Sequence, residues 1–161
     1  MSGPMIERRR IEAEILREVY KSATALVGKE QAKTIIENAV RTSAIEQARQ
    51  FAALSPGGTS LASFVDIQKY WTAENALEIQ TEQSDATHFE FKVTRCRYAE
   101  MYKDMGLGEI GHLLSCNRDG SFCEGYDPKL KLTRTQTIMG GASHCDFKFH
   151  YEDNSKASGG N

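Results

Sequence analysis

The sequence is poor in the features that define several other classes of protein. It has three prolines, one tryptophan and no stretch near the roughly 20 consecutive apolar residues of a membrane span. Its 20 lysines and arginines are outnumbered by 22 aspartates and glutamates, which gives a formal net charge of -2. A nucleic-acid-binding surface usually carries a basic excess. The composition therefore predicts neither a nucleic acid nor a membrane as a partner.

Cysteine is present, but not in the pattern of a zinc ribbon. No C-x-x-C pair occurs among the four cysteines, which are Cys96, Cys116, Cys123 and Cys145. The segment 5–10 is charged and does not resemble a signal peptide. We therefore expect a cytoplasmic protein, in a compartment where structural disulfides are rare. Free thiols in such a protein are core residues, metal ligands or a nucleophile.

The first half of the chain has the apolar spacing of helices. The 161 residues suit one domain with its own core. Apolar residues recur at helical spacing up to Gly28 and again over about 29–54. Two long helices joined by one glycine predict a helical hairpin. After a break at Ser55-Pro56-Gly57-Gly58, Thr59 or Ser60 can cap a third helix that carries the apolar residues of 61–71.

The second half changes to the alternation of strands. Apolar and polar residues alternate over about 87–96, 130–139 and 145–151, with a short helix expected at 98–102 and a turn at Gly140-Gly141. Helices followed by strands predict an α+β fold, in which an N-terminal helical hairpin and a further helix pack on a small antiparallel sheet. We expect this domain to cover 1–151, and the polar tail 152–161 to be disordered.

Reactive residue types crowd into positions 95–146. We expect 116–120 to form a turn that begins with Cys116, whose thiol is the candidate nucleophile, with Cys145 as the next choice. A thiol attacks as a thiolate, and we expect Arg118 to lower the pKa of Cys116. His144 and Asp119 are the candidate base and the carboxylate that orients it.

Each of these residues also has a simpler interpretation. A free cysteine is often core filler, His144 can be structural, and Asp119 before Gly120 is a common turn pair. The thiols and His144 can instead bind zinc, although the sequence requires no cofactor. A reversible disulfide between Cys116 and Cys123 is a third reading of the same region.

Two arginines lie in strand patterns beside apolar residues. Arg95 and Arg134 are therefore expected on inward faces, where a guanidinium needs a partner. A ligand carboxylate is one solution, because arginine binds carboxylates through two parallel hydrogen bonds. An internal acid such as Glu100 is the other.

Four segments of the sequence form a recognisable set: IERRRIE at 6–12, TRCRYAE at 94–100, CNRD at 116–119 and TIMGGASHCDF at 137–147. Together they resemble the L-2-amino-thiazoline-4-carboxylate hydrolase family. The resemblance extends over about residues 5–151. It implies hydrolytic opening of a cyclic C–N bond in a small substrate that carries a carboxylate and an amidine-like carbon.

The resemblance also selects candidate site residues. Cys96, Cys116 and Cys145 occupy motif positions, whereas Cys123 does not. The candidate substrate contacts follow from residue chemistry rather than from the family, and they are Arg95, Cys96, Tyr98, Glu100 and Arg134. The last motif is similar as well to the ligand-binding domain of the four-vinyl-reductase type, which implies small-molecule binding without turnover as the alternative. A homo-oligomer is compatible with either function.

Overall fold

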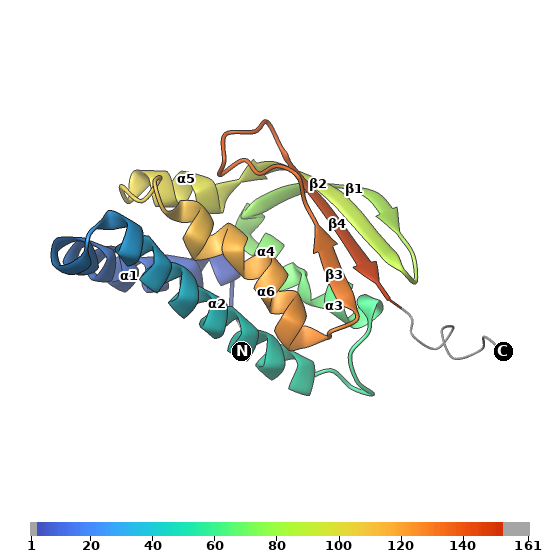
Figure 1. The fold of residues 1–161 in the computed structure, drawn as a ribbon. Helices are drawn as coiled ribbons and strands as arrows, with labels where there is room; N and C mark the ends of the chain where they lie inside the picture. The colour runs from blue at the N-terminus through green and yellow to red at the C-terminus, as the bar shows by residue number, and fades with distance from the viewer. Residues whose placement is uncertain (1–2, 153–161) are drawn as a thin grey trace.

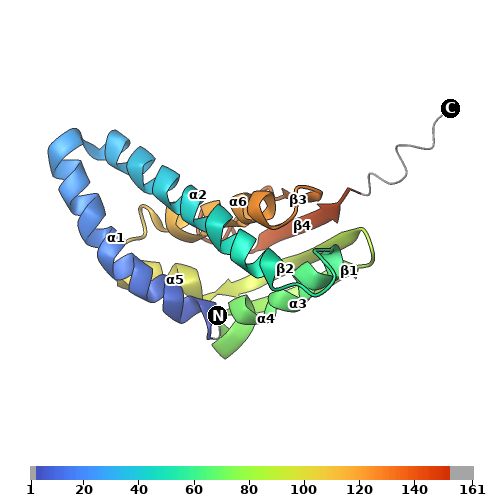
Figure 2. The same cartoon turned by 90° about the horizontal axis from the view of Figure 1, so that it is seen from below.

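In the computed structural model, which describes residues 3–152, two long helices lead into the fold. Helix α1 spans Met5–Val27 and helix α2 spans Lys29–Ala53. Gly28 joins them with a φ of 87°, in the left-handed region that favours glycine. The two helices diverge from this glycine in a V (Figure 2). The predicted helical hairpin is confirmed.

Two short helices follow where one was expected. Helix α3 spans Leu61–Ile67 and helix α4 spans Lys69–Thr72. Ser60 caps α3, because its hydroxyl accepts a hydrogen bond from the Ser63 amide at 3.1 Å and the Ser63 hydroxyl accepts one from the Ser60 amide in return. The predicted cap is confirmed, and Leu61 and Phe64 of α3 are buried in a core that they share with residues of the sheet.

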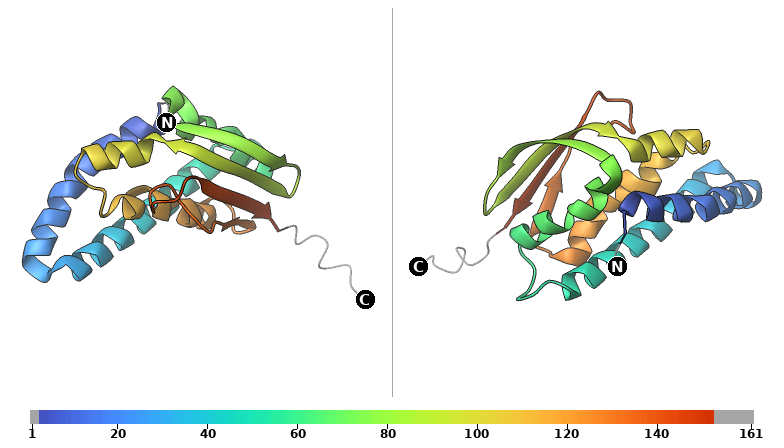
Figure 3. Two further views of the ribbon diagram at one scale, coloured as in Figure 1. Left: turned by 90° about the horizontal axis from the view of Figure 1, so that it is seen from above. Right: turned by 180° about the vertical axis from the view of Figure 1, so that it is seen from behind.

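The strands form one antiparallel sheet in the order β1-β2-β4-β3. Their bounds are Leu77–Ser84 for β1, His88–Cys96 for β2, Leu130–Thr133 for β3 and Cys145–Tyr151 for β4. The helices cover one face of the sheet (Figure 1), and the strands lie in front of them when seen from above (Figure 3). This arrangement confirms the predicted α+β fold class.

Strand β1 was not expected, and the strand predicted over 130–139 is too long. Strand β1 is an edge strand exposed along most of its length, so its sequence lacks the apolar alternation that marks β2. Strand β3 ends at Thr133. The amides of Thr135 and Gln136 donate to the carboxylate of Asp146 instead of to a neighbouring strand, and a turn follows at Gly140-Gly141 as predicted.

The predicted turn at 116–120 is wrong, because this segment is helical. Helix α5 spans Arg97–Asp104, and helix α6 spans Asn117–Tyr126 directly after a π-helical turn over His112–Cys116. Asp119 and Gly120 therefore lie inside α6 rather than in a loop. Among the described residues, no helix is long and apolar enough to cross a membrane.

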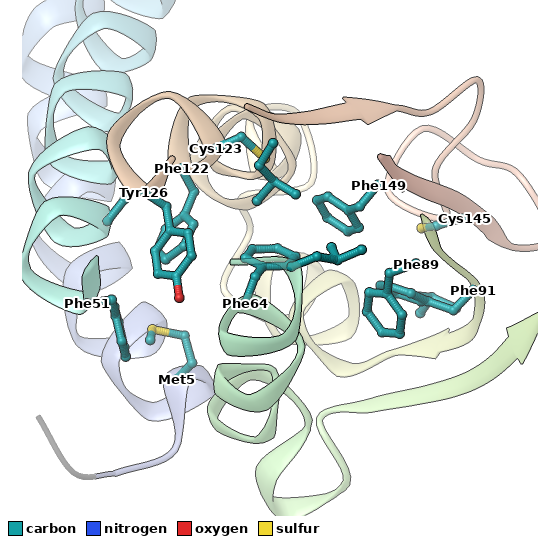
Figure 4. Close-up of a cluster of buried hydrophobic side chains, with 14 residues drawn as sticks. Met5, Phe51, Phe64, Phe89, Phe91, Phe122, Cys123, Tyr126, Cys145 and Phe149 are labelled. Atoms are coloured by element: carbon teal, nitrogen blue, oxygen red, sulfur yellow. The ribbon is translucent and has the colours of Figure 1, made fainter. Parts of the chain in front are cut away.

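Aromatic side chains fill the space between the helices and the sheet. Phe64 of α3 lies at the centre of this cluster and contacts Phe149 of β4 at a centroid distance of 4.8 Å (Figure 4). Phe122 of α6 contacts Phe51 of α2 at 5.9 Å. The expected disordered tail falls almost entirely on residues 153–161, which lie outside the described residues.

Candidate functional site

Helix α6 and the π-helical turn before it carry the CNRD motif. Single π-helical turns inside helices are frequent at functional sites. Cys116 is the last residue of the π-helical turn, and Asp119 stands three positions later. Residues three apart lie on the same side of a helix. The backbone therefore presents the Cys116 thiol and the Asp119 carboxylate in one direction.

Arg134, just after β3, holds this end of α6 against the sheet. Its Nη1 donates to Oδ2 of Asp119 at 2.6 Å, and its Nη2 donates to the carbonyl oxygen of Cys116 at 3.1 Å. The guanidinium also lies 5.0 Å from the ring centroid of Phe147, within the range of a cation–π contact. Burial raises the pKa of the Asp119 carboxyl group, although the charge of Arg134 opposes this change.

The negative charge of Asp119 acts on all four thiols. Burial raises the pKa of Cys116 and Cys123 to about 12 and that of Cys96 to about 11, and Asp119 adds to each increase. The pKa of Cys145 is raised for the same reasons. The pKa of Cys116 is thus raised rather than lowered as expected, and the charge of Arg134 opposes the increase. Every thiol carries its proton at neutral pH in the free protein.

Two of the three motif thiols have fixed hydrogen bonds. Cys96 caps α5, because its sulfur accepts from the Ala99 amide at 3.4 Å. The sulfur of Cys145 accepts from the Ile138 amide at 3.2 Å. The Tyr98 hydroxyl donates to the carbonyl oxygen of Trp71 at 2.9 Å and so ties α5 to α4. These three candidate residues therefore make structural hydrogen bonds, at the start of α5, between α5 and α4, and at the start of β4.

His144 has hydrogen-bonding partners other than Asp119 and Arg134. Its ring is within hydrogen-bonding distance of the Ser143 hydroxyl at 2.9 Å and of the Gln136 amide nitrogen at 3.3 Å. Among the described residues, no hydrogen bond joins His144 to a cysteine or to Asp119. The structure thus brings Asp119, Arg134 and the thiols together, but not this candidate base.

The expectation that Arg95 points inward is wrong. Its side chain is 52% exposed, its Nε donates to Glu100 at 3.0 Å, and its Nη1 is 3.6 Å from Glu78. The residue stands near the end of β2, where the inward alternation has ceased. Glu100 lines a charged surface groove of about 630 Å³ beside α1, which contains no cysteine.

A small cavity lies between the sheet and the helices, and Asp119 lines it. Its volume is about 50 Å³, several times the roughly 10–15 Å³ that one water molecule needs. Because Asp119 lines this cavity, 26% of its side chain is accessible, although burial has the largest effect on its pKa. The other lining residues are Arg9, Phe64, Gln68, Trp71, Leu77, Phe91, Arg118, Phe122, Phe147 and Phe149.

Arg9 is a site residue that the sequence analysis missed, and Arg118, expected only as a charge near Cys116, lines the same cavity. Their side chains are 2% and 6% exposed, and both donate to the carboxylate of Glu12. A signal was present for Arg9, because it stands between Met5 and Ala13 at helical spacing, on the buried stripe of α1. A charge on such a stripe indicates an internal partner or a ligand.

The described residues do not favour zinc or a disulfide. None of their His, Cys, Asp and Glu side chains form a group of three or more that could hold a metal ion. All four cysteines are free thiols. Cys116 and Cys123 lie seven residues apart along a helix, which separates their Cα atoms by about 10 Å. A disulfide spans less than about 7 Å between Cα atoms, so this pair cannot form one without unwinding α6.

Comparisons with known proteins add a family and a fold. No curated protein matches the sequence. The solved structure of the phenol-responsive sensory domain of the transcription activator PoxR, with phenol, has a TM-score of 0.53 and 13% identity, over 88% of this chain and 76% of that chain. Subunit 3 of a trafficking protein particle complex from Naegleria fowleri, covalently bound to palmitic acid, has a TM-score of 0.47 and 13% identity, over 89% and 97% of the two chains. At this identity the likeness to PoxR shows the fold alone.

A family profile matches nearly the whole described chain. It covers residues 8–149, which include the complete aromatic core between helices and sheet, the Asp119–Arg134 pair and all four thiols. The match also contains three of the four segments that carried the resemblance in the sequence. The chain belongs to the L-2-amino-thiazoline-4-carboxylic acid hydrolase family.

Proposed function

We propose that this protein hydrolyses a small carboxylate-bearing ring compound, a thiazoline or a related cyclic amide or amidine, and breaks a ring C–N bond. Family membership supports the ring-opening reaction. The observation that carries the proposal is Asp119, a buried carboxyl group with a raised pKa that lines a cavity and shares a helix face with Cys116. Perturbed ionisable groups in cavities are typical of active sites.

In the proposed reaction, the Cys116 sulfur adds to the ring carbon that lies between two heteroatoms. The thiol is protonated at rest, so its proton must leave during attack, and the Asp119 carboxylate accepts it. A carboxylate whose pKa is raised is a stronger base than an ordinary one. Protonated Asp119 then gives the proton to the ring nitrogen as the C–N bond breaks. Water hydrolyses the remaining sulfur–carbon bond to the enzyme and restores the thiol.

The other candidate residues support this chemistry. Arg134 positions Asp119 and is available to stabilise its charge. Cys145 is the alternative nucleophile and His144 the alternative base. Cys96 and Tyr98 at the start of α5, with Arg95 and Glu100 beside them, remain candidate contacts to the substrate.

The test is turnover of L-2-amino-thiazoline-4-carboxylate by purified protein. We expect a product heavier by one water that carries a new amine. A product that carries a new thiol would instead show that the ring C–S bond breaks. Cys116→Ala should lose on the order of 10³ in rate, the scale of losing a covalent-catalysis residue. Cys123→Ala is the matched control, because Cys123 stands outside the motifs. Full turnover by Cys116→Ala would exclude this nucleophile.

A second candidate function is ligand binding without turnover. The observation in its favour is that all four thiols have raised pKa values, so none is a preformed thiolate. The PoxR domain of similar fold is described as phenol-responsive and its structure contains phenol. This alternative would be favoured if the protein binds a ring acid saturably but forms no product. The measurement is made on metal-free protein and again after metals are added.

A further inference from the structure

One buried arginine of the cavity is incompletely satisfied. The side chain of Arg118 in α6 is 6% exposed. Its Nε donates to the carbonyl oxygen of Leu114 at 3.0 Å and its Nη2 donates to Glu12 at 3.1 Å. Among residues 3–152, its Nη1 has no hydrogen-bond partner. A buried donor without a partner costs free energy, and the cost is larger when the group is charged.

The charges around Arg118 do not balance. One carboxylate, that of Glu12, accepts hydrogen bonds from Arg8, Arg9 and Arg118. Arg9 is itself buried, and its Nη2 donates to the neutral amide oxygen of Gln47 at 3.1 Å. Asp119 is the next nearest acid along α6, but Arg134 already neutralises it. The helix side of the cavity therefore holds an excess of positive charge.

This imbalance shows in the ionisation of Arg118. Burial and then the neighbouring charge of Arg9 lower its pKa to about 10, so it stays protonated at neutral pH. A ligand anion would supply both the missing acceptor and the missing charge. A guanidinium binds a carboxylate well, because its planar donors match two carboxylate oxygens.

The rest of the cavity wall suits a flat ring. Phe64, Phe91, Phe122 and Phe149, which are labelled in Figure 4, all line it, together with Trp71. Aromatic side chains pack against planar rings in stacked or edge-to-face geometry. Charge at one point and aromatic faces around it are the usual composition of a small-molecule site.

We infer that Arg118 binds the carboxylate of a small planar ring acid in this cavity, so that the site prefers such acids to their neutral amides. The inference rests on the proposed function for the nature of the ring and assigns its specificity to a residue of α6. Arg95 is exposed and Arg134 is already paired with Asp119, so neither offers a comparable free donor inside the cavity.

The experiment uses thiazole-4-carboxylate and thiazole-4-carboxamide as probes, because an aromatic thiazole is not opened by hydrolysis. Trp71, the one tryptophan, lines the cavity and reports binding by its fluorescence. We expect the wild-type protein to bind the acid more tightly than the amide. Arg118→Met should weaken acid binding by about 10- to 100-fold, the scale of a charge-assisted hydrogen bond, and leave amide binding nearly unchanged. Arg41→Met, which removes an exposed arginine, is the matched control.

The wild-type comparison of acid and amide keeps the test decisive if Arg118→Met folds poorly, and a second variant adds an independent change of charge. Glu12→Gln preserves the side-chain shape but removes the single shared carboxylate, so the excess positive charge grows. We expect the ratio of acid to amide affinity to rise in this variant, whereas damage to the cavity alone would weaken both probes together. Equal binding of the two probes by wild-type protein, an unchanged ratio in Arg118→Met, or a lower ratio in Glu12→Gln would overturn the inference.

The probes also separate this inference from the proposed function. If the protein opens no ring but prefers the acid in an Arg118-dependent way, the binding site stands and the hydrolase proposal fails. If the protein opens thiazoline acids and Arg118→Met keeps the wild-type KM ratio for acid and amide substrates, the hydrolase proposal stands and the assignment to Arg118 fails.

Discussion

Arg118 and Asp119 are neighbours on α6, yet they belong to two ionic clusters of different character. Asp119 is matched by one arginine, and Arg134 has a further acceptor in the carbonyl oxygen of Cys116. Arg118 shares the acid Glu12 with two other arginines, and within residues 3–152 its Nη1 has no hydrogen-bond partner. We call the first the closed pair, because its two charges balance, and the second the open cluster, because it holds more positive than negative charge.

The difference separates two tasks that an active site must perform. A closed pair fixes the position and pKa of a group that transfers protons. An open cluster retains charge for a ligand, at a cost in stability, since a buried charge that lacks a counter-charge destabilises the fold. Consecutive residues of one helix can carry both tasks because their side chains leave the helix in directions about 100° apart.

The largest expected effect comes from removing Glu12, the acid that the arginines of the open cluster share. Glu12→Ala leaves the buried guanidiniums of Arg9 and Arg118 without a counter-charge, and we expect a loss of about 3–5 kcal/mol in the free energy of unfolding. Urea denaturation measures it. The exposed pair of Arg41 and Glu124 is the control, because Glu124→Ala should cost less than about 1 kcal/mol. Equal losses in the two variants would show that burial does not distinguish these acids.

The next effect disturbs both clusters at once by displacing α6. A Cβ at Gly125 would lie 2.2 Å from the carbonyl oxygen of Ile45 in α2, and backbone cannot move aside as a side chain does. We expect Gly125→Ala to lose about 3 kcal/mol. Gly120, on the same helix, has no atom within 4 Å of its Cβ position, so Gly120→Ala should gain roughly 0.5–1 kcal/mol. Thermal unfolding of the two variants compares them, and a stable Gly125→Ala would contradict the close packing of α6 on α2.

Much of this architecture could be predicted from the sequence. Apolar residues recur at helical spacing in the hairpin and alternate with polar residues in strands β2 and β4. The predictions failed where contacts distant in sequence decide the local structure. Residues 116–120 have turn-forming types, but packing of α6 on α2 holds them in a helix. Strand β1 pairs through its backbone while its side chains remain exposed, so no apolar pattern marks it.

The site was predicted in part for the same reason. The motifs located Cys116 and Asp119, and the strand pattern located Arg134. The structure brings these three residues together. The partnership of Glu12 with Arg118 joins positions at opposite ends of the chain, and nothing in local spacing indicates such a contact. The sequence indicated that Arg9 is buried, because it lies between apolar residues at helical spacing, but it did not indicate which residues pair with Arg9.

A smaller effect tests how the closed pair controls the thiol. Asp119 contributes to the pKa of about 12 at Cys116, after burial. Removing a negative neighbour favours the thiolate, so Asp119→Asn should lower this pKa and speed alkylation of Cys116 by iodoacetamide at pH 8 by roughly tenfold. Mass spectrometry of the labelled peptide measures the rate. Cys116 should label no faster in Arg41→Gln, and a rate unaffected by Asp119→Asn would show that burial alone sets the thiol pKa.

The smallest effect concerns the loop that carries the Cys145 motif. Asp146 accepts hydrogen bonds from the amides of Thr135 and Gln136 and from the Thr135 hydroxyl. Burial acts to raise its pKa, but these hydrogen bonds outweigh burial and lower the pKa to about 2. A carboxyl group whose pKa falls on folding stabilises the protein above its unfolded pKa of about 4, and this contribution is lost as the pH falls toward 2.

Asp146→Asn keeps the shape of the side chain and removes only its charge. Because solvent screens this half-exposed group, we expect a loss below about 1 kcal/mol at pH 7. The gap in Tm between wild type and variant should narrow between about pH 4 and pH 2, where the wild-type carboxylate becomes protonated. Calorimetry across this range measures the gap, with Glu152→Gln as an exposed control outside the loop. A gap that stays constant down to pH 2 would show that the hydrogen bonds act through shape rather than through the charge of Asp146.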